Sequence, residues 1–312
     1  MTDDTIGINI SKATLDAYRL SDGTLAQFNN NKTGFSSLQG WLKNRNIARI
    51  VYEPTGPYHR AFEVAMAARF PLVKVNPLQA RRFAQAHGVR AKTDQVDARM
   101  LAVMGQTFSL EPQIATPDIQ RDLKELHVAR QALIKDRTRA LNRQKTLTLP
   151  ILKRQAKARI TQLNAQLSQV SETINQMLQS TKKTARALDI ICSIPGLSKV
   201  SAAALLIEMP ELGTLKEKQV ASLAGLAPMT RQSGRWSGKA FIQGGRKHLR
   251  DALYMPAVVA ARHNPDMKRF YDRLINAGKP SKVAFTAIMR KLILLANILI
   301  KQDRMWVKLA LD

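Results

Sequence analysis

Residues 5–28 read TIGINISKATLDAYRLSDGTLAQF, and this stretch decides the fold of the N-terminal part of the chain. Short apolar runs over Thr5–Ile10 and Thr14–Leu20 are typical of β-strands. Ser21-Asp22-Gly23 supplies a turn, and Leu25–Phe28 continues as a third strand. The segment therefore predicts three consecutive strands that pair in antiparallel fashion.

Downstream of these strands, helical and strand patterns alternate. We expect two helices and two strands, at Gly34–Leu42, His59–Ala68, Ala48–Tyr52 and Leu72–Val75. Because strands that alternate with helices usually join one sheet, residues 1–115 are predicted to form an α/β domain with a mixed sheet. Pro112 and Pro117 mark the end of this domain.

The middle segment, residues 116–185, is basic and has a helical pattern. Between Arg121 and Arg159, twelve basic residues face only three acids. A heptad pattern runs up to Pro150, and a second apolar series follows it: Ile160, Leu163, Leu167, Val170, Ile174 and Met177. These patterns predict a coiled-coil hairpin, whose apolar seam packs either within one chain or between protomers.

The last segment, residues 186–312, is predicted to be mainly helical. Near its start, Ile194-Pro195-Gly196 precedes an apolar helix at Ser201–Met209. A Pro-Gly turn before a helix exposes backbone N–H groups that can hold a phosphate, as in a helix-hairpin-helix motif. The same turn is also a common plain connection, so the sequence leaves both possibilities open.

Charge and composition limit the partners of the chain. Its 312 residues include 49 Lys and Arg against 23 Asp and Glu, which gives a net charge of +26. This excess indicates a polyanionic partner, either nucleic acid or an acidic membrane. We see no apolar run of the ~20 residues that span a bilayer, no secretory signal, and only Cys192, which excludes a disulfide framework. We therefore expect a cytoplasmic nucleic-acid protein with no membrane partner.

Three carboxylates form a candidate metal site. Asp94 and Asp97 are three residues apart, a spacing that puts both on one face of a helix. Glu53 ends a strand just before Pro54, where open α/β sheets place their ligands. Clustered carboxylates repel each other unless a cation lies between them, which favours Mg²⁺ and phosphoryl transfer. The alternative is an ordinary helix start, capped by Thr93, whose dipole favours nearby acids.

A full site of this kind also needs an acid on the first strand, and Asn9 occupies that position. Its amide oxygen can coordinate a metal, but the missing negative charge weakens the site. Asp16 on the next strand is the nearest spare carboxylate, and its position could equally be a solvated face.

Ser233 is a candidate nucleophile. It lies next to Gly234 in the segment Pro228–Arg250, which holds six basic residues and no acid. Such cations would hold a phosphodiester and stabilise the charge that develops when a hydroxyl attacks it. The alternative is a simple Ser-Gly turn in a basic loop.

The basic residues are expected to contact nucleic-acid backbones rather than to read bases. The candidates are Arg121, Lys124, Arg130, Arg137 and Arg143 in the middle segment and Arg231, Arg235, Lys239, Arg246 and Lys247 in the last.

A series of short motifs follows in a fixed order along nearly the whole chain. They are Gly7-Ile8-Asn9, Glu53-Pro54-Thr55-Gly56, Lys92-Thr93-Asp94, Asp97-Ala98-Arg99, Ile194-Pro195-Gly196, Ala224-Gly225-Leu226-Ala227-Pro228, Gln232-Ser233-Gly234, Gly244-Gly245-Arg246, and Leu249-Arg250 with Ala252-Leu253-Tyr254. Each motif is weak alone. Together the ordered set resembles the DEDD insertion-sequence transposases related to the Piv invertase, a group of bridge-RNA-guided recombinases.

The resemblance implies an N-terminal RuvC-like domain with an RNase H fold (1–115), a coiled-coil segment (116–185) and a C-terminal transposase domain with a catalytic serine (186–312). Carried over by motif, the catalytic and metal-binding residues are Asn9, Glu53, Asp94 and Asp97, and the serine is Ser233. The family has aspartate at the first position, so the Mg²⁺ site of this chain is expected to be weaker.

The resemblance therefore predicts a transposase or site-specific recombinase of a mobile element, acting at the bacterial nucleoid. It implies a structured non-coding guide RNA that pairs with donor and target DNA, a dimer or tetramer, and a covalent serine–DNA intermediate. Two alternatives stay open: a metal-dependent nuclease of the Holliday-junction type, and a nucleic-acid-binding protein without catalysis.

Overall fold

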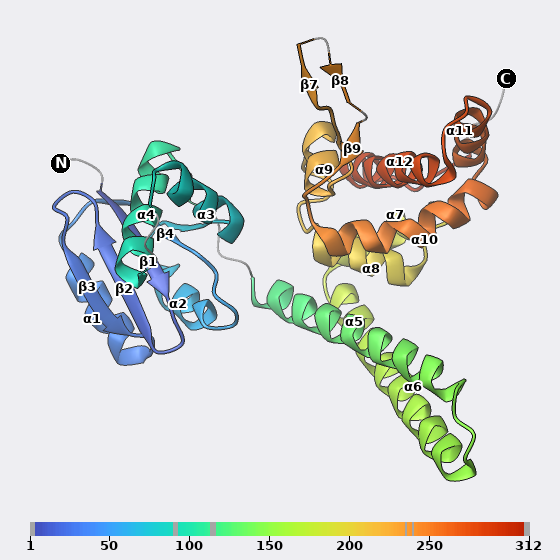
Figure 1. The fold of residues 1–312 in the computed structure, drawn as a ribbon, viewed down its shortest axis with the longest axis horizontal. Helices are drawn as coiled ribbons and strands as arrows, with labels where there is room; N and C mark the ends of the chain where they lie inside the picture. The colour runs from blue at the N-terminus through green and yellow to red at the C-terminus, as the bar shows by residue number, and fades with distance from the viewer. Residues whose placement is uncertain (1–3, 90–92, 113–116, 235, 239, 309–312) are drawn as a thin grey trace. The chain divides into compact units, whose positions relative to one another are not determined.

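The computed structural model describes residues 4–89, 93–112, 117–234, 236–238 and 240–308 (Figure 1). The chain divides into two compact units, Met1–Thr116 and Pro117–Asp312. The basic helical segment belongs to the second unit together with the C-terminal helices. The division into three domains remains a prediction from the sequence.

The first unit contains a five-stranded sheet. Its strands are β1 (Asp4–Ile10), β2 (Thr14–Arg19), β3 (Leu25–Asn29), β4 (Ile47–Tyr52) and β5 (Leu72–Lys74), in the order β3-β2-β1-β4-β5. The first three are antiparallel neighbours, whereas β4 is parallel to β1 and β5 is parallel to β4. This confirms the predicted mixed α/β sheet, and each predicted strand agrees with the observed one to within a residue at either end.

Helices cover both faces of this sheet. They are α1 (Lys32–Leu42), α2 (His59–Met66), α3 (Pro77–Ala86) and α4 (Asp94–Thr107). The isoleucines of β1 pack with Phe35 and Phe62 on one face. On the other face α4 lies directly against β1, because a Cβ at Gly7 would be only 1.9 Å from the carbonyl oxygen of Ala98. Helix α3 was not predicted from the sequence, although Asn76 caps it and Pro77 begins it.

Two long helices form a hairpin in the second unit, α5 (Asp118–Gln144) and α6 (Pro150–Gln179) (Figure 1). Pro150 stands in the first turn of α6, where a missing N–H costs nothing. Within the single chain, Leu163, Leu167 and Ile174 of the predicted seam are already buried. The seam therefore packs within one chain, which is one of the two arrangements left open by the sequence.

The remaining helices share one apolar core: α7 (Lys182–Cys192), α8 (Lys199–Glu208), α9 (Glu217–Leu223), α10 (Lys247–His263), α11 (Pro265–Asn276) and α12 (Ser281–Lys301). The Pro-Gly turn joins α7 to α8. Gly196 has a φ of 106°, and a Cβ there would lie 2.7 Å from the Cβ of Ala260 in α10. Close packing on α10 thus requires this glycine.

Four two-residue strands separate α9 from α10, and the sequence did not predict them. They are β6 (Pro228–Met229), β7 (Gln232–Ser233), β8 (Trp236–Ser237) and β9 (Phe241–Ile242), paired β6 with β9 and β7 with β8. Figure 1 shows the β7–β8 hairpin extending away from the helices of its unit. The described part of this basic segment therefore contains short paired strands, whereas the sequence offered a plain basic loop as one alternative.

Helix α12 corrects the expectation about apolar runs. Its 21 residues, with a mean hydropathy of 1.9 in the most apolar window, are long and apolar enough to cross a membrane. Arg290 and Lys291 interrupt the run, but the average over a window tolerates both. Ile288, Leu292 and Leu299 are fully buried in the core of the second unit, which is the packing of a core helix.

Candidate functional site

Three elements of the first unit carry the predicted acid site. Ile8 of β1 pairs with Tyr52 of β4, so Asn9 and Glu53 follow at the ends of two adjacent parallel strands. Thr93 caps helix α4, and its hydroxyl accepts a hydrogen bond from the Val96 backbone N–H at 3.3 Å. Asp94 and Asp97 therefore stand in its first turn, where the helix dipole favours carboxylates.

The structure joins these residues in pairs. The amide Nδ2 of Asn9 donates a hydrogen bond to Oδ1 of Asp94 at 2.9 Å, which links β1 to α4 across 85 residues of sequence. Glu53 and Asp97 both line a cleft of about 560 Å³ that is also bordered by α3. Within the described ranges, no three His, Cys, Asp or Glu side chains gather closely enough to hold a metal ion.

A buried carboxylate next to Asn9 bears on whether a cation fits here. Asp16 of β2 lies directly opposite Asn9 in the antiparallel ladder and is only 3% exposed. Gln27 donates a hydrogen bond to its Oδ1 at 2.8 Å. Its Oδ2 is buried and finds no hydrogen-bond partner in the described part of the chain. Such an oxygen is unfavourable unless a donor or a cation reaches it. Carboxylate and amide oxygens are the donors that Mg²⁺ prefers, so the chemistry of these side chains is compatible with Mg²⁺, although the described side chains are not gathered into a closed site.

A second buried polar cluster stabilises β4 and α2 and was not predicted. The carboxylate of Glu63 accepts a hydrogen bond from the Tyr52 hydroxyl and forms an ion pair with Lys74. Burial and the bond to Glu63 raise the pKa of Tyr52, whereas burial lowers the pKa of His59, which lies 3.7 Å from Glu63. These groups pair with each other and fix the end of β4, directly before Glu53.

Ser233 lies in β7 and is exposed. Gly234 next to it has a φ of 56°, so it makes the turn to β8, where Trp236 pairs with Ser233. The Arg231 guanidinium lies 4.7 Å from the centroid of the Phe241 ring. The Ser233 side chain is therefore accessible to a large molecule.

Of the predicted cations near Ser233, Arg235 and Lys239 lie outside the described residues, and Arg246 and Lys247 have carboxylate partners. Arg246 donates two hydrogen bonds to Glu211, both at 2.8 Å, and one to the backbone oxygen of Glu208. The bonds from Arg246 lower the pKa of Glu211, and those to Glu211 raise the pKa of Arg246. Lys247 pairs with Asp251 at 2.7 Å.

Four of the predicted basic residues of α5 also have partners in the described part of the chain. Arg121 pairs with Asp118, Lys124 with Glu208, Arg130 with Ser171 and Arg137 with Asn164, while Arg143 is exposed. Burial lowers the pKa of Arg130 and also that of the adjacent His127. A count of nearby acids could not predict these partners, because Ser171 and Asn164 are uncharged and Glu208 lies far away in the chain.

Two family models match successive parts of the chain. Residues 6–152 match a family model for DEDD transposases of IS110 elements, described as "Transposase", and residues 188–272 match one described as "Transposase IS116/IS110/IS902 family". The chain is 31% identical to the pilin gene-inverting protein of Moraxella bovis over 316 residues, with 96% of each chain covered. The protein of the same name from Moraxella lacunata gives the same identity and coverage.

A shorter match concerns an insertion element. The IS110 uncharacterized 43.6 kDa protein of Streptomyces coelicolor is 29% identical over 169 residues, which cover 52% of this chain and 40% of that protein. The full-length similarities and the two family models agree with the order of motifs found in the sequence. The chain therefore belongs to the IS110 family of DEDD transposases.

Proposed function

We propose that this transposase is an RNA-guided recombinase of a mobile element. Its first unit would provide a RuvC-like metal site, and its second unit would provide the serine that cuts and rejoins DNA. The family supports DNA transposition or inversion. The single observation that carries the finer proposal is the hydrogen bond between Asn9 and Asp94, which brings together two motif residues from distant elements.

Four side chains would hold the metal: Asn9, Glu53, Asp94 and Asp97. When bound, Mg²⁺ would neutralise charge on the phosphate and polarise its oxygens. Asn9 contributes an amide oxygen only if its amide rotates away from the observed bond to Asp94. The carboxylate of Asp16 adds negative charge beside it.

Ser233 would act as the nucleophile. Its Oγ loses a proton and forms a bond to phosphorus, while the bond between phosphorus and one sugar oxygen breaks and that oxygen leaves as a hydroxyl. The number of phosphodiester bonds is conserved, so the reverse attack can rejoin a different strand without ATP. The exposed position of Ser233 supports this role.

The partners would be donor DNA, target DNA and a structured non-coding guide RNA, bound by a dimer or tetramer at the bacterial nucleoid in the cytoplasm. The net charge of +26 supports the binding of several polyanions. After Asp136 the next acid is Glu172, so the distal half of the α5–α6 hairpin presents exposed cations such as Arg143 without a local acid.

A nicked suicide substrate tests the proposal. Incubated with Mg²⁺ and the copurified RNA, the Asn9→Asp protein should become covalently attached to DNA through residue 233. Ser233→Ala should abolish the adduct, while the matched control Ser237→Ala from the same hairpin should retain it. An adduct mapped to another residue, or strand exchange by Ser233→Ala, would replace the proposal with a metal-only nuclease.

A further inference from the structure

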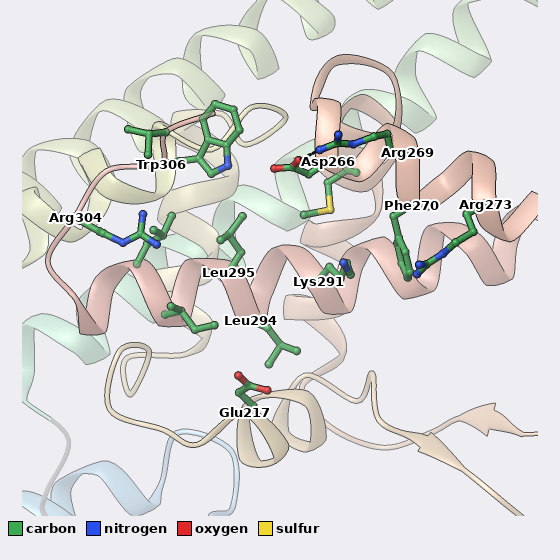
Figure 2. Close-up of a pocket in the computed structure, with 14 residues that line it drawn as sticks. Glu217, Asp266, Arg269, Phe270, Arg273, Lys291, Leu294, Leu295, Arg304 and Trp306 are labelled. Carbon is green, nitrogen blue, oxygen red and sulfur yellow. Dashed lines mark hydrogen bonds and ion pairs between the residues drawn. The ribbon is translucent and has the colours of Figure 1, made fainter. Parts of the chain in front are cut away.

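A pocket of about 650 Å³ opens in the second unit between α11, α12 and the segment that follows α12 (Figure 2). The α12 residues Leu294, Leu295 and Ile298 give it an apolar lining. Figure 2 shows Phe270 toward one end and Trp306 toward the other. The acid site and the serine hairpin contribute no residue to this lining.

Basic side chains dominate the polar lining. Four cations, Arg269, Arg273, Lys291 and Arg304, face two carboxylates, Glu217 and Asp266. Asp266 is already neutralised by Arg269 at 2.6 Å. Lys291 and Arg273 lie 4.3 and 5.1 Å from the centroid of the Phe270 ring, and within the described ranges neither pairs with a carboxylate. The pocket therefore favours an anion.

The segment that carries Trp306 is fixed in place. Arg186 donates hydrogen bonds to the side chain and the backbone oxygen of Asp303, at 2.7 and 3.0 Å. The backbone N–H of Trp306 donates to the hydroxyl of Ser193 at 2.8 Å. A ring held in this way is available for stacking without a large loss of conformational freedom on binding.

We propose that this pocket binds one unpaired nucleotide, with the base against Trp306 and the leucines and the phosphate on Lys291. The inference rests on the nucleic-acid function proposed above. An aromatic ring next to cations is the usual chemistry for single strands, because every base has a flat apolar face and an adjacent negative charge. A base inside a duplex keeps its faces stacked and cannot enter such a pocket.

Binding of labelled oligonucleotides to the full chain tests this site. The probes are an RNA and a DNA of about 12 nucleotides with the same sequence, and the fully paired DNA duplex. Trp306→Leu should weaken binding of single strands about tenfold, as expected for loss of one stacked base, and leave duplex binding unchanged. Lys291→Gln should weaken the same probes several-fold and reduce their salt dependence. Lys268→Gln, an exposed cation of α11 outside the lining, is the matched control.

The outcomes separate the sources of the nucleotide. A loss confined to RNA assigns the site to the guide, a loss confined to DNA assigns it to an opened DNA strand, and an equal loss shows that the sugar is not read. The inference is overturned if both variants have the melting temperature of the Lys268→Gln control and bind single strands as tightly as that control does. It is also overturned if the variants lose self-association but keep their affinity for single strands. Lys291→Gln decides alone if Trp306→Leu does not fold. Failure of the unaltered protein to bind any probe would instead overturn the proposed function.

Discussion

In the first unit, Asn9 and Asp94 come from a central strand and from the capped first turn of a helix, joined by a hydrogen bond. In the second unit, Ser233 lies in a two-residue strand of an exposed hairpin. A metal site requires several oxygens at fixed distances, so rigid elements suit it. A nucleophile must meet a phosphodiester of a large polymer, so an exposed ribbon suits it. The residues around Asn9 are thus held on rigid elements, whereas Ser233 is held on an accessible one.

A pair of glycine substitutions would test this contrast and should give the largest difference. Gly7→Ala puts a Cβ against the backbone of α4, so it should destabilise the protein by about 3 kcal/mol. Gly234→Ala meets open space and only the strain of φ 56°, about 1 kcal/mol. Chemical denaturation measures both. Equal losses in the free energy of unfolding for the two variants would mean that the two regions are equally rigid.

A carboxylate at position 9 should make the stability of the protein depend on Mg²⁺. Asn9→Asp replaces the hydrogen bond to Asp94 by two facing carboxylates, which should cost about 1–2 kcal/mol without Mg²⁺. Saturating Mg²⁺ should reverse the loss, because a ligand of the native state stabilises it. Thermal melting with EDTA or Mg²⁺ measures this. If Mg²⁺ leaves the melting temperatures of the unaltered protein and of Asn9→Asp unchanged, a cation at this site is excluded.

Two arginines predicted to bind nucleic acid should behave differently. Arg246→Gln breaks the paired bonds to Glu211, so it should lower the free energy of unfolding by about 1–2 kcal/mol. Arg143→Gln removes an exposed charge, so it should leave stability unchanged and reduce the salt slope of duplex binding by about 1. Titrations with duplex DNA at several salt concentrations measure this slope. The roles would be reversed if Arg246→Gln reduced the slope and Arg143→Gln lowered the free energy of unfolding.

The smallest expected effect is a loss of folding stability at acidic pH. Because its bonds with Arg246 keep the pKa of Glu211 below its ordinary value of 4.5, the ionised carboxylate stabilises the folded state above that pH. This stabilisation should disappear as the pH falls through the lowered pKa. Arg246→Gln should remove that part of the acid dependence. Melting curves at pH 6 and below, compared between the two proteins, measure the difference.

The sequence predicted the elements better than their partners. Short apolar runs located β1 to β5, because a sheet covered by helices on both faces buries most residues of its central strand. The sequence placed Asn9 with the acids of the candidate site, but it did not predict the hydrogen bond from Asn9 to Asp94. The burial of Asp16 and the bonding of Arg246 to Glu211 depend on residues brought together by the tertiary fold. Patterns of neighbouring residues contain no information about such partners.

The thin pairing of the β7–β8 hairpin has a practical consequence for proteolysis. Strands of two residues give the backbone little protection, and segments of this kind open far more readily than a packed core. The exposed Arg231 stands directly before this hairpin, so trypsin should nick the folded protein after it. Cleavage that slows when DNA is added would provide a footprint of the strand at this ribbon, independent of any catalytic turnover.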